Sequence, residues 1–312
     1  MTRKFVIKTI VFCGILSAVV YGIGHFFTRG FVDQYYTHFL KPSKSLIIGA
    51  SRSLEGIMPQ EVNKGMNKNY DLFNFAIDAD IVKYGSVYFE AIKEKLVESD
   101  DPQLFILEIN PLVFSRLKSN LSDDEKEFEE HKQLMAKQWF FNSTPNIEYL
   151  IKNHTPLFDL ILNRNKEHEV FKPYPDGFLE LTLPMDSLSY KKRCEIYMNT
   201  FNTFETFNTY SPTRMNYFKN IVEFLSKKGN IILVRMPVNK ENLEREHRYL
   251  PSLDSIISNY ANDKGIPYLN YVNQGNKYQS MDGFHLEKNA AKKFSYQLGH
   301  DIDSVLALKP KL

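Results

Sequence analysis

The distribution of apolar residues divides the 312-residue chain into an apolar start and a long remainder of alternating short apolar runs and amphipathic segments. Thr9–Phe27 is an almost uninterrupted apolar run. As a helix, its 19 residues span roughly 28 Å, close to the hydrocarbon thickness of a bilayer. Arg3, Lys4 and Lys8 precede the run, and Arg29 follows it closely. The pattern therefore predicts one transmembrane helix, with a cytoplasmic N-terminus and the residues from about 30 onward outside.

Two other interpretations compete with a membrane anchor. A secretory signal peptide has a shorter apolar core, about 7–15 residues, before a small-residue cleavage site. Ser17-Ala18-Val19 matches such a site poorly and lies inside the run. A buried core helix is the second alternative, but the run has no amphipathic stripe, and its glycines at positions 14, 22 and 24 suit a membrane helix better. We therefore expect a single-pass anchor.

Beyond a mixed linker at residues 31–44, the hydrophobic period is that of alternating strands and helices. Short apolar runs predict five buried strands, at Ser45–Gly49, Asp71–Ala76, Gln103–Ile109, Asn230–Met236 and Ile266–Tyr271. Amphipathic spacing predicts helices at Ile81–Leu96, Arg214–Lys228, Glu241–Lys264 with a break at Pro251, and Glu287–Leu306. Strands and helices alternating at these lengths imply a mostly parallel five-stranded sheet covered on both faces, a three-layer α/β/α fold.

The alternation is interrupted between about residues 112 and 212. Ser122–Gln138 and Asn146–Asn163 are helix candidates there, and prolines 173, 175 and 184 mark irregular chain. We interpret this stretch as a mainly helical insertion over one end of the sheet, where it can form a lid or a docking surface. The predicted organisation is a cytoplasmic tip and transmembrane anchor at residues 1–30, a linker at 31–44, and an α/β domain at 45–312 that holds the insertion.

Composition and charge narrow the function without identifying it. With 43% hydrophobic and 24% charged residues, the chain has the composition of a globular protein. A net charge of +2 argues against a nucleic-acid-binding protein. Because Cys13 and Cys194 are the only cysteines, a disulfide framework and a cysteine-rich zinc module are excluded. The sequence has neither the spacing of a dinucleotide-binding loop or P-loop nor a paired metal-ligand motif, so we expect no cofactor and no metal.

Three polar segments follow predicted strands, and the first is Gly49-Ala50-Ser51-Arg52-Ser53. A serine at a strand-to-helix turn can present its hydroxyl at the carboxyl edge of a sheet, with its own N–H facing an oxyanion. Glycine and serine are also common in turns, and an N-capping serine explains the segment without any chemistry. Taken alone, the segment leaves both interpretations open.

The other two segments are Met281–Leu286 and Glu108–Pro111. Asp282 and His285, three residues apart on a tight turn, can face one side, so that the carboxylate orients the imidazole. Asn110 can donate a hydrogen bond into the same edge. The alternatives are a helix-capping Asp beside an incidental His, and a strand-ending Asn-Pro turn. A parallel sheet brings all three segments to one edge, and this order favours a site.

In this order the segments resemble the sequence blocks of the SGNH (GDSL-type) hydrolases and acyltransferases. Gly49-Ala50-Ser51 looks like the first block, Asn110 falls at the third-block Asn, and Asp282-x-x-His285 matches the fifth block. The resemblance covers residues 45–110 and 213–306, outside the insertion. It implies a flavodoxin-like α/β/α fold and a serine that becomes acylated. A membrane-anchored domain with this first block is similar to alginate acetyltransferase-like and D-alanyl-transfer proteins, which work beside membrane-bound O-acyltransferases.

The resemblance implies a role for each matching residue. Ser51 would be the nucleophile, His285 its general base, and Asp282 the acid that orients the imidazole. The backbone N–H of Ser51 and the side chain of Asn110 would be oxyanion donors.

The chain also departs from the family pattern. Ala50 stands where the first block has Asp, and Glu108 stands where the third block has Gly. The second block brings a glycine whose N–H completes the oxyanion hole, but the matching stretch, Asn74–Ala79, contains no glycine. A backbone N–H of Asp78 or Ala79 would then be the remaining donor.

These observations predict a membrane-anchored, extracytoplasmic serine esterase or O-acyltransferase that acts on a cell-envelope glycan or polymer through an acyl-Ser51 intermediate. The expected partner is a membrane-bound O-acyltransferase, and no nucleic acid is expected. The alternative is a catalytically weak relative that binds a glycan or scaffolds an envelope acylation machinery. Arg52 is the predicted substrate-binding residue; in the alternative, it and basic residues of the insertion would hold an anionic polymer.

Overall fold

The computed structural model describes residues 3–27, 38, 42–79, 82–120, 122–132 and 170–308. Helix α1 (Arg3–Phe27) is continuous, as the apolar run predicts. It is long and apolar enough to cross a membrane, and its large apolar side chains are exposed, unlike those of a core helix. Helix α1 belongs to one compact unit, and the described residues from 42 onward belong to another.

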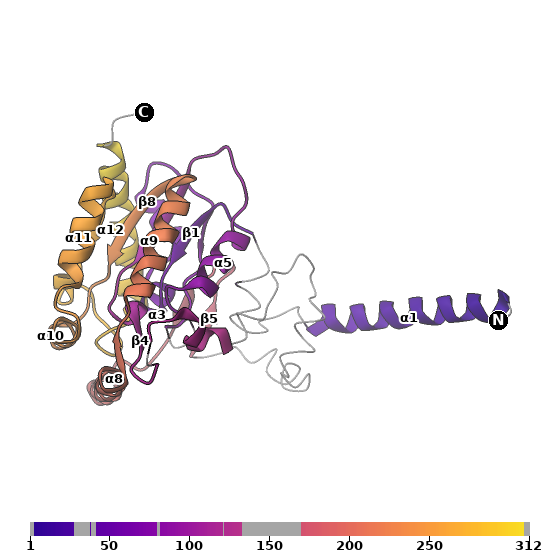
Figure 1. The fold of residues 1–312 in the computed structure, drawn as a ribbon, viewed down its shortest axis with the longest axis horizontal. Helices are drawn as coiled ribbons and strands as arrows, with labels where there is room; N and C mark the ends of the chain where they lie inside the picture. Colours follow the sequence, from indigo (N-terminus) through magenta and orange to yellow (C-terminus); the bar gives the residue numbers. More distant parts are fainter. Residues whose placement is uncertain are drawn as a thin grey trace. The chain divides into compact units, whose positions relative to one another are not determined.

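A five-stranded parallel sheet lies at the centre of the second unit (Figure 1). Its strands are β1 (Ser45–Ile48), β2 (Leu72–Asn74), β3 (Gln103–Glu108), β8 (Gly229–Arg235) and β9 (Tyr268–Asn270). Their spatial order is β2-β1-β3-β8-β9, and every neighbouring pair is parallel. In chain order this is the 2-1-3-4-5 arrangement of flavodoxin-like folds, so the predicted fold class is confirmed.

Helices cover both faces of this sheet. They are α3 (Ser51–Gly56), α4 (Pro59–Gly65), α5 (Ser86–Lys95), α9 (Pro212–Ser226), α10 (Lys240–Tyr249), α11 (Leu253–Lys264) and α12 (Lys288–Ala307). Helix α12 packs against α3 and α4, and its Phe294 shares a hydrophobic cluster with Ile47 and Ile106 of the sheet. Helix α9 packs against β8 and α5 and contacts α11 through Phe218 and Tyr260. Every residue of β1 and β3 is buried, as expected for strands covered on both faces.

The predicted elements differ from the observed ones mainly at their ends. Helix α5 begins at Ser86 instead of Ile81. The predicted break at Pro251 is present, because α10 ends at Tyr249 and α11 begins at Leu253. Helix α9 begins two residues earlier than predicted, with Ser211 as its N-cap accepting a hydrogen bond from the N–H of Arg214.

The described parts of the insertion contain one long helix and several short elements. These are η1 (Leu112–Phe114), β4 (Ser115–Leu117), η2 (Glu125–Glu127), η3 (Glu129–Lys132), β5 (Phe171–Pro173), β6 (Leu179–Leu181), α8 (Ser187–Phe207) and β7 (Asn208–Tyr210); a further turn, η5 (Val272–Gln274), follows β9. Strands β4 and β7 pair antiparallel, as do β5 and β6. The predicted helix Asn146–Asn163 lies outside the described residues.

The predicted helix Ser122–Gln138 is wrong for its described part, where the chain forms the 3₁₀ turns η2 and η3. Phe128 and Glu130 are both buried there. Two residues apart, they would point about 200° apart around an α-helix and could not both face the core. Glu130 forms a bidentate pair with the buried guanidinium of Arg214, at 2.6 and 2.9 Å. Burial of this pair therefore overrides the helical propensity of the charged segment.

Replacing Glu130 with Ala should destabilise the fold strongly, because it leaves the guanidinium of Arg214 buried without a counter-charge. The expected loss is about 3–5 kcal/mol in the free energy of unfolding. The matched control is Glu90→Ala, which removes an exposed pair with Lys93 and should cost less than about 1 kcal/mol. Thermal unfolding of the full-length chain in detergent measures both. Equal melting temperatures for the two variants would contradict the assigned importance of the buried pair.

Candidate active site

The turn that follows β1 places Ser51 at the first position of α3. Ser51 is not the N-cap: that position is Ala50, whose side chain makes no capping bond. The helix itself does not use the N–H of its first residue, so the N–H of Ser51 is available. Gly49 permits this geometry, because a Cβ there would lie 2.5 Å from the Cβ of Glu108. The structure thus decides against the capping interpretation of Ser51.

A second tight turn holds Asp282 and His285. Its backbone closes through the N–H of Met281, which donates to the carbonyl of His285 at 2.7 Å, and Gly283 adopts a positive φ of +94°. One oxygen of Asp282 accepts the N–H groups of Phe284 and His285, each at 2.8 Å. Its other oxygen lies 2.7 Å from Nδ1 of His285. Because Glu287 is the N-cap of α12, Asp282 does not cap that helix and is bonded to the imidazole instead.

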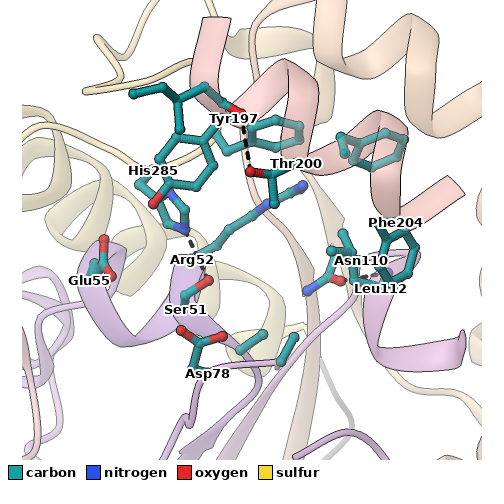
Figure 2. A pocket seen from close by; sticks show the side chains of 15 residues that line it. Ser51, Arg52, Glu55, Asp78, Asn110, Leu112, Tyr197, Thr200, Phe204 and His285 are labelled. Carbon is teal, nitrogen blue, oxygen red and sulfur yellow. Dashed lines mark hydrogen bonds between the residues drawn. The ribbon is translucent and has the colours of Figure 1, made fainter. Parts of the chain in front are cut away.

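The two turns meet at the carboxyl edge of the sheet. Nε2 of His285 lies 2.9 Å from Oγ of Ser51, although 234 residues separate them in the chain (Figure 2). Asp282 and His285 are buried, and the ring of Tyr197 packs edge-on against the imidazole at 5.2 Å. The predicted meeting of these three side chains is therefore present, as a hydrogen-bonded chain from carboxylate to imidazole to hydroxyl.

Asn110 reaches the same edge from the end of β3. Its Oδ1 accepts the N–H groups of Leu112 and Val113, at 2.9 and 3.2 Å, so the amide also shapes the turn. Its Nδ2 donates to Oε1 of Glu108 at 2.7 Å. Figure 2 shows the amide nitrogen on the side of Asn110 that faces Ser51. The turn-forming and site-forming interpretations of Asn110 are thus compatible.

Asp78 and Ala79 line the pocket beside Ser51. Their loop is tied to the serine turn because the N–H of Ile77 donates to the carbonyl of Gly49 at 3.1 Å. The carboxylate of Asp78 points toward Ser51 in Figure 2. This loop, which contains no glycine, therefore lines the pocket beside Ser51 and brings a carboxylate close to it.

Arg52 lines the pocket as well, but its guanidinium is engaged. It forms a buried ion pair with Glu246 and lies 4.8 Å above the ring centre of Phe284. Glu246 also pairs with Arg235 at 3.0 Å. The guanidinium of Arg52, which was predicted to bind substrate, is thus already paired with the buried carboxylate of Glu246.

The pocket at this edge has a volume of about 370 Å³, and α8 forms one of its walls. Tyr197, Phe201 and Phe204 of α8 line it, together with Phe284 beside the imidazole. The insertion therefore contributes an aromatic wall, as the expected lid or docking role allows. Helix α8 itself was not predicted, although Asp186 is a good N-cap and aromatic residues recur at helical spacing after it.

Burial and neighbouring charges shift the pKa values of three groups at this site. Burial lowers the pKa of His285, but the carboxylates of Asp282 and Glu55 outweigh it and raise the pKa to about 9. Burial raises the pKa of Glu55 to about 7, and His285 opposes the shift. Burial also raises the pKa of Asp282, but His285 and two backbone N–H groups outweigh it, and the net pKa is lowered. The imidazole therefore holds its proton more tightly than an exposed histidine does.

Two acidic residues of the site, Glu55 and Glu108, have no role predicted from the sequence. Glu55 lies one helical turn after Ser51 and lines the pocket, and one of its carboxylate oxygens is buried with no hydrogen-bond partner in the described part of the chain. The spacing of four residues within a short helix is the signal that could have found it. Glu108 is fully buried at the end of β3, where an acidic residue closing an apolar strand was the available signal. Among the described residues, no group of three His, Cys, Asp or Glu side chains could hold a metal ion.

Comparisons with known proteins add little at this distance. No protein-family model and no curated protein matches the chain. Among solved structures, an inhibitor-bound aryl esterase of M. smegmatis is similar with 7% identity and a TM-score of 0.35, covering 84% of this chain and 100% of its own. A carbohydrate acetylesterase from Sinorhizobium meliloti is similar with 11% identity and the same TM-score, covering 85% and 98%. Such similarity does not define a family, so any function must follow from the pocket itself.

The raised pKa of His285 gives a direct test of the site. Nitrogen NMR of the full-length chain in detergent should show one imidazole that titrates near pH 9. Asp282→Asn should bring this pKa down, because burial still disfavours the charged ring while its strongest supporting charge is gone. The control, Glu90→Gln, changes an exposed carboxylate paired with Lys93 and should leave the titration in place. A histidine pKa unmoved by Asp282→Asn would contradict the geometry.

Proposed function

We propose that the protein is a membrane-anchored, SGNH-type serine esterase or O-acyltransferase whose acyl intermediate forms on Ser51. The observation that carries this proposal is the chain of hydrogen-bonded contacts from Asp282 through His285 to Ser51, at 2.7 and 2.9 Å. A carboxylate, an imidazole and a hydroxyl in this sequence form the arrangement that activates a serine for nucleophilic attack.

In the first half of the reaction, Oγ of Ser51 attacks the carbonyl carbon of an acyl donor. Nε2 of neutral His285 accepts the hydroxyl proton, while Asp282 accepts a hydrogen bond from Nδ1–H and stabilises the imidazolium. The tetrahedral intermediate then expels the donor's leaving group, which takes the proton from His285. The products of this half are an ester on Ser51 and a neutral imidazole.

In the second half, a hydroxyl group attacks the ester on Ser51. His285 removes the proton of the attacking hydroxyl and returns it to Oγ when the ester bond breaks. Water as acceptor gives an esterase, and a sugar hydroxyl gives an O-acyltransferase. The aromatic wall formed by Tyr197, Phe201 and Phe204 supports a glycan or polyol acceptor, because aromatic rings pack well against the apolar faces of sugars.

The negative charge of each tetrahedral intermediate needs donors at the pocket floor. The N–H of Ser51 and Nδ2 of Asn110 are the first two, and the N–H of Asp78 or Ala79 is the third. Arg52 contributes to substrate binding through its position in the pocket wall, with its charge shared with Glu246.

The N-terminal helix supports an extracytoplasmic location for this chemistry. With the basic residues Arg3, Lys4 and Lys8 kept in the cytoplasm, α1 would cross the membrane once and leave the α/β domain outside. A domain tethered there can receive an acyl group from a membrane-bound O-acyltransferase and pass it to a glycan of the cell envelope.

Labelling with a fluorophosphonate tests the proposed nucleophile. The full-length chain should form an adduct on the peptide that contains Ser51, detected by mass spectrometry, and Ser51→Ala should abolish it. The matched control is Ser53→Ala, two residues away, which should still carry the label at the end of the reaction because the hydroxyl of Ser53 is buried against Glu108.

The same labelling discriminates between the enzyme and its alternative. A folded chain that carries no adduct would reject the enzyme and favour a glycan-binding or scaffolding protein. An adduct that persists in Ser51→Ala would reject the assigned nucleophile.

The pH dependence of activity follows from the raised pKa of His285. Only the neutral imidazole can accept the proton of Ser51, so kcat/KM for an activated ester should rise with pH and level off above about pH 9. Glu55→Gln should move this rise to lower pH, because it removes a negative charge that stabilises the imidazolium. Steady-state rates measured from about pH 6 to about pH 10 give the pH profiles of the wild type and of Glu55→Gln. A plateau already reached at neutral pH would contradict the raised pKa of His285.

A further inference from the structure

The carboxylate of Glu108 joins the serine turn to Asn110. The residue is fully buried at the end of β3. Its Oε2 accepts the N–H of Ala50 at 2.7 Å, the N–H of Ser53 at 3.2 Å and the hydroxyl of Ser53 at 2.6 Å. Its Oε1 accepts Nδ2 of Asn110 at 2.7 Å. One carboxylate thus connects the turn that follows β1 to the residue Asn110 that follows β3.

These contacts require a group that only accepts hydrogen bonds. Donors surround both oxygens, so a glutamine at position 108 would turn its own NH₂ group toward a donor on one side or the other. A buried donor facing a donor loses a hydrogen bond on each side, which costs more than the mean value of one bond. A carboxylate is the side chain of this length that satisfies every partner.

The position of Gly49 gives independent support. A Cβ at residue 49 would lie 2.5 Å from Cβ of Glu108 and 2.6 Å from its Oε2. The absence of a side chain at Gly49 is therefore what lets the carboxylate approach the serine turn. Gly49 and Glu108 therefore pack directly against each other at the ends of the neighbouring strands β1 and β3.

The orientation of Asn110 follows from these contacts. Its Oδ1 is held by the N–H groups of Leu112 and Val113, so the amide cannot flip without breaking both bonds. One hydrogen of Nδ2 is taken by Glu108. Glu108 leaves the second hydrogen of Nδ2 unused, and Asn110 lines the same pocket as Ser51.

We propose that Glu108 is a positioning residue that orients the side-chain amide of Asn110 for donation to the oxyanion and locks it to the turn carrying Ser51. This role rests on the proposed serine chemistry. Glu108 touches neither the substrate nor the reacting atoms, and it acts through Asn110. A glycine at position 108, as the family pattern has, would offer no side chain to hold the amide of Asn110.

A double-mutant cycle tests this role with the full-length chain in detergent and 4-nitrophenyl acetate as the probe ester. Asn110→Ala should lower kcat about 10²–10³-fold, the cost of one oxyanion donor. Glu108→Gln should lower kcat about tenfold or more with little change in KM, because the interaction lost is made in the transition state. The double variant should lie within about threefold of Asn110→Ala alone, since Glu108 acts through that amide.

Glu130→Gln is the matched control, because it neutralises another buried carboxylate that pairs with Arg214 away from the pocket. It should lower the melting temperature and leave kcat per folded molecule unchanged. Rates are normalised to the folded fraction from the thermal melt. If Glu108→Gln does not fold, Glu108→Asp takes its place, since its carboxylate still only accepts hydrogen bonds but sits on a side chain one methylene shorter. The same non-additivity with Asn110→Ala is expected.

Two results would overturn the role of Glu108 alone. One is a wild-type kcat in Glu108→Gln, and the other is a double variant whose loss equals the product of the two single losses. A wild-type chain that neither hydrolyses the ester nor takes a fluorophosphonate on Ser51 would instead overturn the proposed function, and this role with it.

Discussion

Parallel pairing of the central strands is the constraint on which the pocket depends. Because β1 and β3 run side by side in the same direction, the segments that follow them leave the sheet at one edge. The crossovers from β1 to β2 and from β3 to β8 run to opposite sides of this pair, and this opens a crevice at the strand ends. Ser51 and Asn110 flank that crevice, and the turn of Asp282 and His285 reaches it from the far end of the chain. A change in strand order would separate these residues even if every local turn were preserved.

Several buried polar groups at this edge are hydrogen-bonded to one another, and these contacts restrain their side chains. Glu108 collects hydrogen bonds from the serine turn and from Asn110, while Asp282 accepts the backbone N–H groups of its own turn as well as the imidazole. Such networks hold side chains in one geometry because a partial loss leaves buried charge unpaired. In contrast, one oxygen of Glu55 has no hydrogen-bond partner among the described residues, and burial raises its pKa to about 7. Its charge therefore acts on His285 without being tied to the network.

Sequence patterns were sufficient where the signal is local. The short apolar runs predict the strands, and the parallel topology then brings Ser51, Asn110 and His285 together without further information. Prediction failed where long-range contacts override local preference. The segment around Phe128 has helical composition, but the buried contact between Glu130 and Arg214 holds it in short turns. The contacts of Glu108 with the serine turn could not be predicted, because Ala50 and Ser53 lie more than fifty residues earlier in the chain.

The proposed function requires three things: a membrane anchor, an acyl group on Ser51 at the sheet edge, and an acceptor bound at the aromatic wall of the insertion. The most direct measurement traps the intermediate itself. The full-length chain is mixed with an activated acetyl ester, quenched in acid within the first turnovers, and mapped by peptide mass spectrometry. The account predicts an acetyl group on the peptide that contains Ser51. This acetylated species should accumulate when water is the only acceptor and reacts slowly with it. A folded chain that turns over the ester with acetyl on another residue, or with none on Ser51, would contradict it.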